Sequence, residues 1–312
     1  MSNTFGSIFK ITTFGESHGT LLGVTIDGLW GGIEISQKNI SDALDERKPS
    51  GVGSTERREK DEFEIVSGLF EGKTTGAPLT IIIKNTDARP QDYESLKNTF
   101  RDGHGDKSWL DRYGYRDYRG GGRLSGRETV SRVVAGAIAM QILNTLGISI
   151  KTEIISIHGD YENFDNIIKK AMEMHDSVGG RIKCTISGVE AGIGEPVFDK
   201  LDAVLSHAIM SIGAVKGIEF GSGFHSEFLY GSENNKIENA GGILGGISNG
   251  QDIIFNVAVK PTPTINSGKR HDTCIVLRIG AVIKAMAAIT ILDYYLIKYS
   301  SNNLKRYFKK EV

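Results

Sequence analysis

The chain has 312 residues, and its 37 Lys and Arg are balanced by 38 Asp and Glu, so its formal net charge at pH 7 is -1. This balance argues against a nucleic-acid-binding protein that works through a general basic field, and 39% hydrophobic with 24% charged residues is typical of a globular chain. Glycine is unusually frequent, at 39 residues against 6 prolines, but no Gly-X-Y period is present, so collagen is excluded.

Taken in chain order, short segments rich in Ile, Val, Phe and Thr predict strands, and longer segments with helix start or stop signals predict helices. The predicted strands are 22–26, 63–66, 79–83, 182–186, 217–220 and 253–259. The predicted helices are about 37–47, 127–146, 199–212 and 280–297. The second helix is the best delimited, because Ser125 and Glu128 match a capping box and Gly147 supplies a stop. No linker rich in Pro or Ser divides the chain, so we expect a single domain over 1–312.

The two halves of the chain, about 5–150 and 151–297, resemble each other. The matching blocks are 25–33 with 185–193, 64–69 with 219–224, and 76–83 with 250–257. Three blocks in the same order suggest an internal duplication, although chance similarity between glycine-rich strands is the alternative. In a duplicated α+β fold, the helices of both halves would pack between two outer sheets around a pseudo-two-fold axis.

The two cysteines, Cys184 and Cys274, lie far apart and match no zinc-ligand spacing, so we expect reduced, buried thiols and no metal site. The N-terminal sequence has neither the basic nor the apolar region of a signal peptide. The most apolar stretch, 274–297, is interrupted by three charged residues, which favours a buried amphipathic helix over a membrane span. We therefore expect a cytoplasmic protein without membrane contact, ending in a solvated, frayed tail over 298–312.

Four glycine-rich segments contain groups that bind anions or transfer protons. They are 13–19, 101–106, 116–129 and 239–272. The first two each place a histidine, His18 or His104, between glycines that let the backbone turn tightly beside a ligand. A structural histidine in a polar turn is the alternative for each. Ser17 precedes His18, but a nucleophile and its base must meet in space, which adjacency in sequence does not ensure.

The segment 116–129 carries the strongest physical signal. Its glycine-rich loop runs into a predicted helix, so free N–H groups and the positive end of the helix dipole converge. Arginines at 119, 123 and 127 add guanidinium groups, which suit phosphate and carboxylate. A further basic set, which includes Arg47, Lys48 and Arg57, lies at and beyond the end of the first helix, where a solvated helix end is the alternative. Together these segments favour a polyanionic small molecule as the ligand.

The fourth segment contains two Gly-Gly pairs within 239–250, which allow the backbone to lie flat against a planar ring or another strand. It continues through Lys260 and its neighbours to the triplet 270–272, in which an arginine, a histidine and an aspartate are adjacent. The triplet alone is weak, and a surface position is its alternative interpretation.

The motifs of these segments occur in the order FGESHG, GKTTGAP, DYRGGGR, RET, SGVEAGIGEPVFDKLDA, NAGGILGGISNGQDI, KPTPTI and RHD. Together, over about 5–297, they resemble the chorismate synthase family. The resemblance implies a β-α-β sandwich, with helices between two antiparallel sheets, and a homotetramer. It implies the last step of the shikimate pathway, in which 5-enolpyruvylshikimate 3-phosphate loses phosphate and a ring proton by 1,4-anti elimination to give chorismate. Reduced FMN would be needed although the reaction is redox-neutral, with NADPH as a reductant of the flavin.

The resemblance also implies roles for individual residues. His18 and His104 would perform acid chemistry, His104 near the flavin and His18 near the departing phosphate, and Asp272 would act with the flavin N5. Ser17 and Ser125 would hydrogen-bond a proton relay or a ligand. The implied flavin contacts are Arg123, Leu124, Ser125, Gly213, Ala214, Gly245, Lys260, Pro261, Thr262, Pro263, Thr264 and Arg270. The predicted substrate contacts are Arg47, Lys48, Arg57, Arg119 and Arg127.

The chain also departs from the family pattern. The family's R-R-R-P-G reads Glu46 to Ser50, and a substrate-holding arginine is absent between Gly51 and Glu56. Two regions are shortened, around 162–175 and between Thr264 and Arg270. Two alternatives to a working chorismate synthase therefore stay open: a flavin-dependent NAD(P)H reductase using the same pocket, and a degenerate flavin- or anion-binding relative without turnover.

Overall fold

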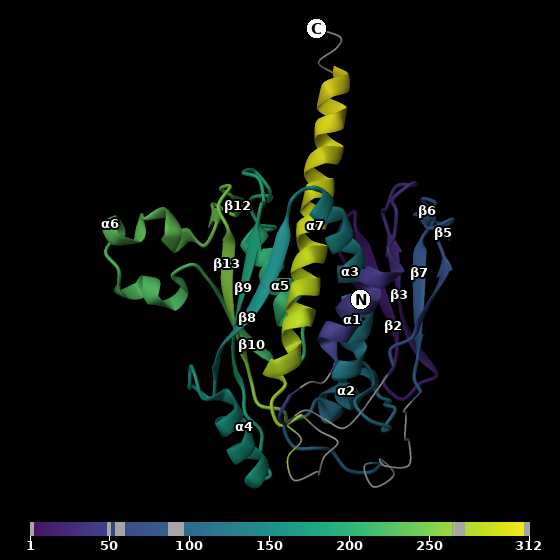
Figure 1. Ribbon diagram of the computed structural model, residues 1–312, viewed down its shortest axis with the longest axis vertical. Coiled ribbons are helices and arrows are strands. Elements are labelled where there is room, and N and C mark those ends of the chain that lie inside the picture. Colours follow the sequence, from purple (N-terminus) through teal and green to yellow (C-terminus); the bar gives the residue numbers. More distant parts are fainter. Residues whose placement is uncertain are drawn as a thin grey trace.

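A computed structural model describes residues 3–48, 51–53, 60–86, 97–263, 265 and 272–308, the last eight of these by their backbone alone. Two antiparallel sheets enclose a layer of helices (Figure 1). The first sheet has the order β1 (Thr4–Phe5), β2 (Lys10–Gly15), β3 (Leu21–Asp27), β7 (Leu79–Lys84) and β4 (Phe63–Ser67). The second has the order β10 (Val215–Phe220), β13 (Ile253–Val259), β9 (Gly180–Ser187) and β8 (Ser149–Ile157).

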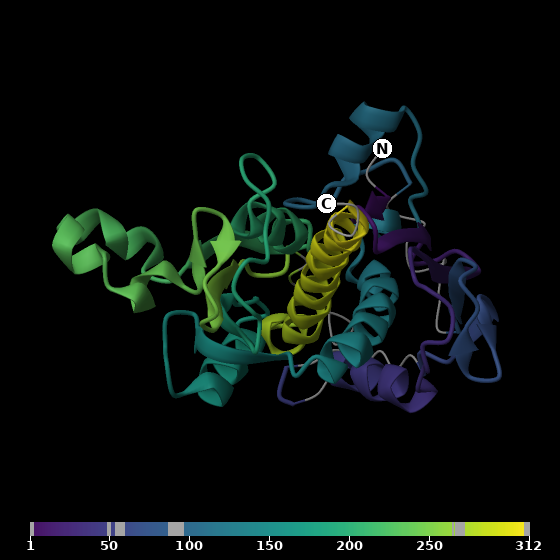
Figure 2. The same ribbon diagram turned by 90° about the horizontal axis from the view of Figure 1, so that it is seen from above.

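The helix layer consists of α1 (Gln37–Arg47), α3 (Thr129–Thr145), α5 (Leu201–Met210) and α7 (Val276–Phe308). Viewed along the helices, α7 lies in the centre of the layer beside α3 (Figure 2). The buried apolar residues of both sheets and of these helices form one continuous hydrophobic core. The β-α-β layering implied by the family resemblance is therefore present.

The two sheets share one strand order. In chain order, β2, β3, β4 and β7 of the first sheet correspond to β8, β9, β10 and β13 of the second. In both sheets the first two of these strands are neighbours, the fourth lies beside the second, and the third is at the edge. Strand β1 extends the first sheet at its other edge.

All six strands predicted from the sequence are present, but β2 and β8 were missed, as were α2 (Asp106–Tyr113) and α4 (Phe164–Glu173). The sequence does contain a pattern that predicts α4, in the region around 162–175 that was interpreted as shortened. Its apolar residues recur at helical spacing, which marks one face that packs on the core: Phe164, Ile167, Ile168 and Ala171. The smaller elements are β5 (Leu69–Phe70), β6 (Lys73–Thr74), α6 (Gly231–Asn234), β11 (Ile243–Leu244) and β12 (Ile247–Ser248).

The predicted capping box at the start of α3 is wrong. The Ser125 hydroxyl accepts the backbone N–H of Arg127 at 3.2 Å, which caps a short 3-10 turn, and α3 begins only at Thr129. The Glu128 carboxylate does not return to Ser125, because it accepts hydrogen bonds from Thr13 Oγ1 at 2.9 Å and Arg132 Nε at 3.0 Å. The stop was predicted correctly, since α3 ends at Thr145 and Gly147 adopts φ +77°.

Helix α7 is longer and more deeply buried than the amphipathic helix predicted over 280–297. Apolar side chains are buried on nearly all its sides, because it runs between α3, α5 and the second sheet. Its charged residues have specific partners: Lys284 contacts Glu46 at 3.0 Å, and Asp293 accepts three backbone N–H groups from 7–9. The backbone continues as helix to Phe308, where a frayed tail was expected. No helix among the described residues is long and apolar enough to cross a membrane.

Candidate functional site

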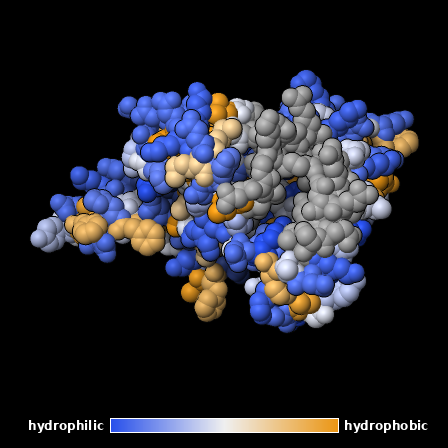
Figure 3. All heavy atoms as spheres, turned by 90° about the horizontal axis from the view of Figure 1, so that it is seen from below, coloured by the Kyte–Doolittle hydropathy of each residue, from blue (hydrophilic) through white to orange (hydrophobic). Residues whose placement is uncertain are grey.

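Most of the predicted site segments, namely 13–19, 101–106, 116–129 and the described part of the fourth from Lys260 on, gather at the end of the helix layer where α3 and α7 begin (Figure 1). Segment 101–124, which includes α2, crosses this end of the sandwich. Both helices direct the positive ends of their dipoles toward it, which favours an anionic ligand. The described surface seen from this end is mainly hydrophilic, with scattered hydrophobic patches (Figure 3).

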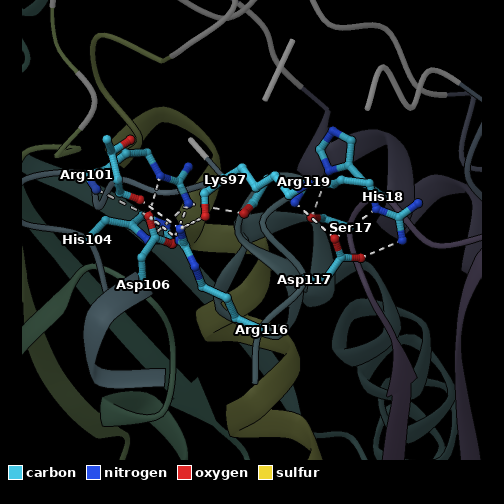
Figure 4. A network of polar contacts seen from close by, with 11 residues as sticks. Ser17, His18, Lys97, Arg101, His104, Asp106, Arg116, Asp117 and Arg119 are labelled. Atoms are coloured by element: carbon cyan, nitrogen blue, oxygen red, sulfur yellow. Dashed lines mark hydrogen bonds and ion pairs between the residues drawn. The ribbon is translucent and has the colours of Figure 1, made fainter. Parts of the chain in front are cut away.

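His104 lies in a cluster of charged side chains at the start of α2. Its Nδ1 is 2.8 Å from Asp106 Oδ1 and 3.2 Å from Arg101 Nη2 (Figure 4). Arg101 donates to both carboxylate oxygens of Asp106, at 2.7 and 2.8 Å, so the pair forms a rigid support for the ring. Since Nδ1 faces this support, Nε2 is the ring atom that can exchange a proton with a ligand.

The pKa of His104 is held below its ordinary value of 6.5, first by burial and then by the positive charge of Arg101, against the opposing effect of Asp106. We expect the imidazole NMR signal of His104 to titrate below pH 6.5, and Arg101→Met to move that titration upward. Because the folded pKa is the lower one, the unfolded chain takes up the proton first. The ring therefore reduces folding stability as pH falls through about 6.5 toward the folded pKa.

Arg112→Met is the matched control for this titration, because Arg112 is an exposed arginine of α2 that lies over the Tyr113 ring. That variant should leave the His104 titration unchanged. An unchanged titration in Arg101→Met would contradict the assigned cause.

His18 lies in a second cluster, beside the end of β2. Ser17 Oγ lies 3.1 Å from His18 Nδ1, and both residues are buried, so the two neighbours in sequence also meet in space. Arg119 donates to both carboxylate oxygens of Asp117, at 2.8 and 2.7 Å. These hydrogen bonds hold the pKa of Asp117 below its ordinary value, and His18 adds a smaller effect in the same direction. His18 and Arg119 thus share one electrostatic environment (Figure 4).

The two histidine clusters are joined through Gly120. Its carbonyl accepts a hydrogen bond from Arg101 Nη2 at 3.2 Å, and its Cα packs against the His18 ring. One cavity is lined by Asp106 of the first cluster and Asp117 of the second, together with Glu16, Trp109, Arg116 and 120–124. The glycine-rich loop 120–122 therefore brings together the two histidines that the sequence singled out.

Residues 260–263 lie against the His104 segment. Lys260 Nζ donates to the Gly103 carbonyl at 3.5 Å, and the backbone N–H of Lys260 donates to the Ala214 carbonyl at 2.9 Å. Thr262 Oγ1 donates to the Asp272 carbonyl at 2.9 Å. The structure thus brings the predicted residues at 213–214, 260–263 and 272 to the His104 segment, although 109 to 168 residues separate them from His104 in the chain.

Other predicted contacts are placed differently. The Arg123 guanidinium holds β2, donating to Thr13 Oγ1 at 2.6 Å and to the Gly15 carbonyl at 3.2 Å. Lys48 Nζ pairs with Asp45 at 2.5 Å.

Gly245 lies at the start of α5, because the carbonyl of the adjoining Gly246 accepts a hydrogen bond from the backbone N–H of Leu201. Gly213 follows the end of α5, so the length of that helix, about 15 Å at 1.5 Å per residue, separates Gly245 from Gly213. The predictions at Arg57, Thr264 and Arg270 lie outside the described residues.

Two residues that the sequence interpretation missed complete the site. Asp61 and Asn85 accept hydrogen bonds from Arg127, and Asp61 also accepts one from Arg47 at 2.8 Å. Asp61 belongs to no motif, so no local signal marked it, whereas Asn85 lies in the segment 84–87, which resembles the family pattern but suggested no role for that side chain. Among the described residues, no group of three or more His, Cys, Asp and Glu side chains could hold a metal ion.

The family model of chorismate synthase matches residues 9–296 of the chain. The chain belongs to the chorismate synthase family. The chorismate synthase of Maridesulfovibrio salexigens is 45% identical over 343 aligned positions, which cover 95% of this chain and 98% of that protein. That of Lachnoclostridium phytofermentans is 45% identical over 364 positions and covers 99% of both chains. Both alignments are longer than 312 residues, so these chorismate synthases contain insertions that this chain lacks.

A solved structure has the same architecture. A crystal structure of chorismate synthase aligns with a TM-score of 0.78 at 27% sequence identity, covering 94% of this chain and 93% of that one. The fold implied by the sequence motifs is therefore that of the family, including the two antiparallel sheets and the helices between them.

Proposed function

We propose that the chain converts 5-enolpyruvylshikimate 3-phosphate to chorismate and inorganic phosphate, as the lyase of the last step of the shikimate pathway. Family membership supports this reaction. The observation that carries it to this chain is the pair of histidine clusters, His18 with Arg119 and His104 with Arg101, whose carboxylates Asp117 and Asp106 line one cavity. Elimination breaks a carbon–oxygen bond to phosphate and removes a ring proton, so it needs proton-transfer groups and cations at separate points.

Phosphate binding and proton transfer are assigned to side chains at different positions of the site. Beside His18, the Arg119 guanidinium would bind the phosphate, and the imidazole would supply a proton as the phosphate departs. Ser17, in contact with His18 Nδ1, would hold the ring orientation. On the other side, the supported Nδ1 of His104 leaves Nε2 to hold or move a proton. Asp272 and Ser125 stay candidates for the proton relay.

Reduced FMN is the proposed cofactor, with NADPH as its possible reductant. The residues present suit it: Lys260 supplies a cation, Leu124 is 46% exposed, and the Cα of Gly213 faces open space. These features leave a face for a flat ring beside 260–263. When bound, the flavin would supply a transient electron that helps the phosphate leave.

We further propose that the chain is one internally duplicated domain with pseudo-two-fold symmetry, assembled as a cytoplasmic homotetramer. The shared strand order of the two sheets and the single core that joins both halves support the duplication. Close superposition of the four-stranded units of the two sheets, with α1 on α5 and α3 on α7, is the expected result.

The deciding experiment mixes the purified chain with reduced FMN and 5-enolpyruvylshikimate 3-phosphate under anaerobic conditions. We expect equal amounts of chorismate and phosphate, because the elimination releases one of each. NAD(P)H oxidation without the phosphorylated substrate and without chorismate would favour the flavin-dependent reductase. Ligand binding without either reaction would identify a degenerate relative.

A further inference from the structure

A buried carboxylate holds two of the predicted substrate arginines. Asp61 lies between α1 and β4, and its side chain is 1% exposed. Its Oδ2 accepts a hydrogen bond from Arg47 Nη2 at 2.8 Å, and its Oδ1 accepts one from Arg127 Nη1. Arg127 Nε in turn donates to Asn85 Oδ1 at 3.2 Å. The last residue of α1 and the turn that precedes α3 are therefore joined through one side chain.

The charged groups of this cluster act strongly on one another. Burial disfavours the ionised Asp61, but the charges and hydrogen bonds of Arg47 and Arg127 hold its pKa below the ordinary value. The pKa of Arg47 is lowered, first by burial and further by the charges of Arg127 and Arg278, while Asp61 acts in the opposite direction. Arg278, whose charge acts on Arg47, is itself paired with Asp272.

One buried donor of the cluster, Arg47 Nε, lacks a hydrogen-bond partner in the described part of the chain, which favours a ligand at this place. The Arg47 side chain is 8% exposed, and its Nε has no hydrogen-bond partner among the described residues. A buried donor without a partner is unfavourable, and an acceptor on a ligand would satisfy it. An unused guanidinium donor suits a phosphate or carboxylate group.

We propose that Asp61 is a positioning residue that holds Arg47 and Arg127 at a fixed separation as one receptor for an anionic group of the substrate. The inference rests on the proposed function for the identity of that substrate. Without the carboxylate the two guanidiniums would repel each other at close range, and neither would keep its orientation. Asp61 thus acts through the arginines and does not itself touch the substrate.

Asp61→Asn tests the proposal. An amide presents one acceptor oxygen and one donor nitrogen, so it can satisfy only one of the two guanidiniums. Isothermal calorimetry with oxidised FMN present measures the Kd for 5-enolpyruvylshikimate 3-phosphate without turnover. We expect this Kd to rise about tenfold to a hundredfold, KM to rise with it, kcat to change much less, and FMN affinity to stay unchanged. Asp61→Glu, which keeps the charge, should recover part of the affinity.

Asp293→Asn is the matched control, because it removes another buried carboxylate, about 22 Å along α7 from Arg278 at 1.5 Å per residue. It should lower Tm but leave Kd and KM unchanged. If Asp61→Asn does not fold, Arg47→Lys keeps the charge but lacks Nε, and should raise Kd similarly. An Asp61→Asn or Arg47→Lys variant with wild-type Kd would overturn the proposal. A wild-type chain that binds the substrate but forms no chorismate would contradict the proposed function alone.

Discussion

Replacing His104 by alanine should lower kcat by about a hundredfold or more, the scale of a lost acid–base group, while the chain keeps its fold. The ring lies on the Asp106–Arg101 pair, which stays joined by two hydrogen bonds after the ring is removed. The supporting charges therefore stay in place, and only the proton-transfer group is lost. Anaerobic chorismate formation at saturating substrate measures kcat, and circular dichroism checks the fold.

His225→Ala is the control for this substitution. His225 is an exposed histidine in the connection between β10 and α6, and its ring contacts Phe228. Its removal should leave kcat within about twofold of the wild-type value. Near-normal turnover in His104→Ala would remove His104 from the mechanism, whatever the control shows.

Replacing Gly120 by alanine should also reduce turnover by about a hundredfold or more, although the side chain gained is a single methyl group. A Cβ at this position would lie 2.4 Å from His18 Nδ1 and 3.2 Å from Ser17 Oγ. The backbone cannot relax easily, because its φ is +74° and its carbonyl is held by Arg101. The His18 ring must therefore move, and a displacement of about 1 Å at a reacting group can cost about a hundredfold in rate.

Gly114→Ala separates this effect from backbone strain. Gly114 ends α2 with a φ of +71°, close to that of Gly120, but a Cβ there would meet no atom within 4 Å. Both variants should lose about 1–2 kcal/mol of folding stability from the left-handed backbone. Only Gly120→Ala should lose turnover, and equal activity in the two variants would contradict the placement of His18 against Gly120.

Much of the fold was predictable because its signals are local. The helix at 37–47 was predicted with the bounds that the structure gives, and the strand at 253–259 likewise. Apolar patterning and flanking glycines lie within a few residues of each element, so a single sequence carries them. The missed elements β2 and α2 are short and flanked by functional glycine-rich loops, where patterning is weaker.

The candidate site was predictable only in part. The motifs marked His18, His104 and Lys260 as site residues, but their distances depend on loops that cross between elements far apart in the chain. Arg123 illustrates the limit, because its position in a glycine-rich motif suggested a ligand contact, while its guanidinium also holds β2 beside the cavity. A long flexible side chain can serve either purpose, and its neighbours in space decide which.

The sequence by itself thus determined the family, the alternation of strands and helices, and the glycine-rich loops that we propose surround an anionic ligand. Only the tertiary structure decided which charged groups share a partner. It placed Asp61 between Arg47 and Arg127, which are 80 residues apart in the chain, and it turned Glu128 from a helix cap to a partner of β2. Charged groups that are buried away from water need partners, and these partners are whichever groups the packing of the chain brings close. The spacing of two residues in the sequence does not encode the distance between their side chains in the folded protein.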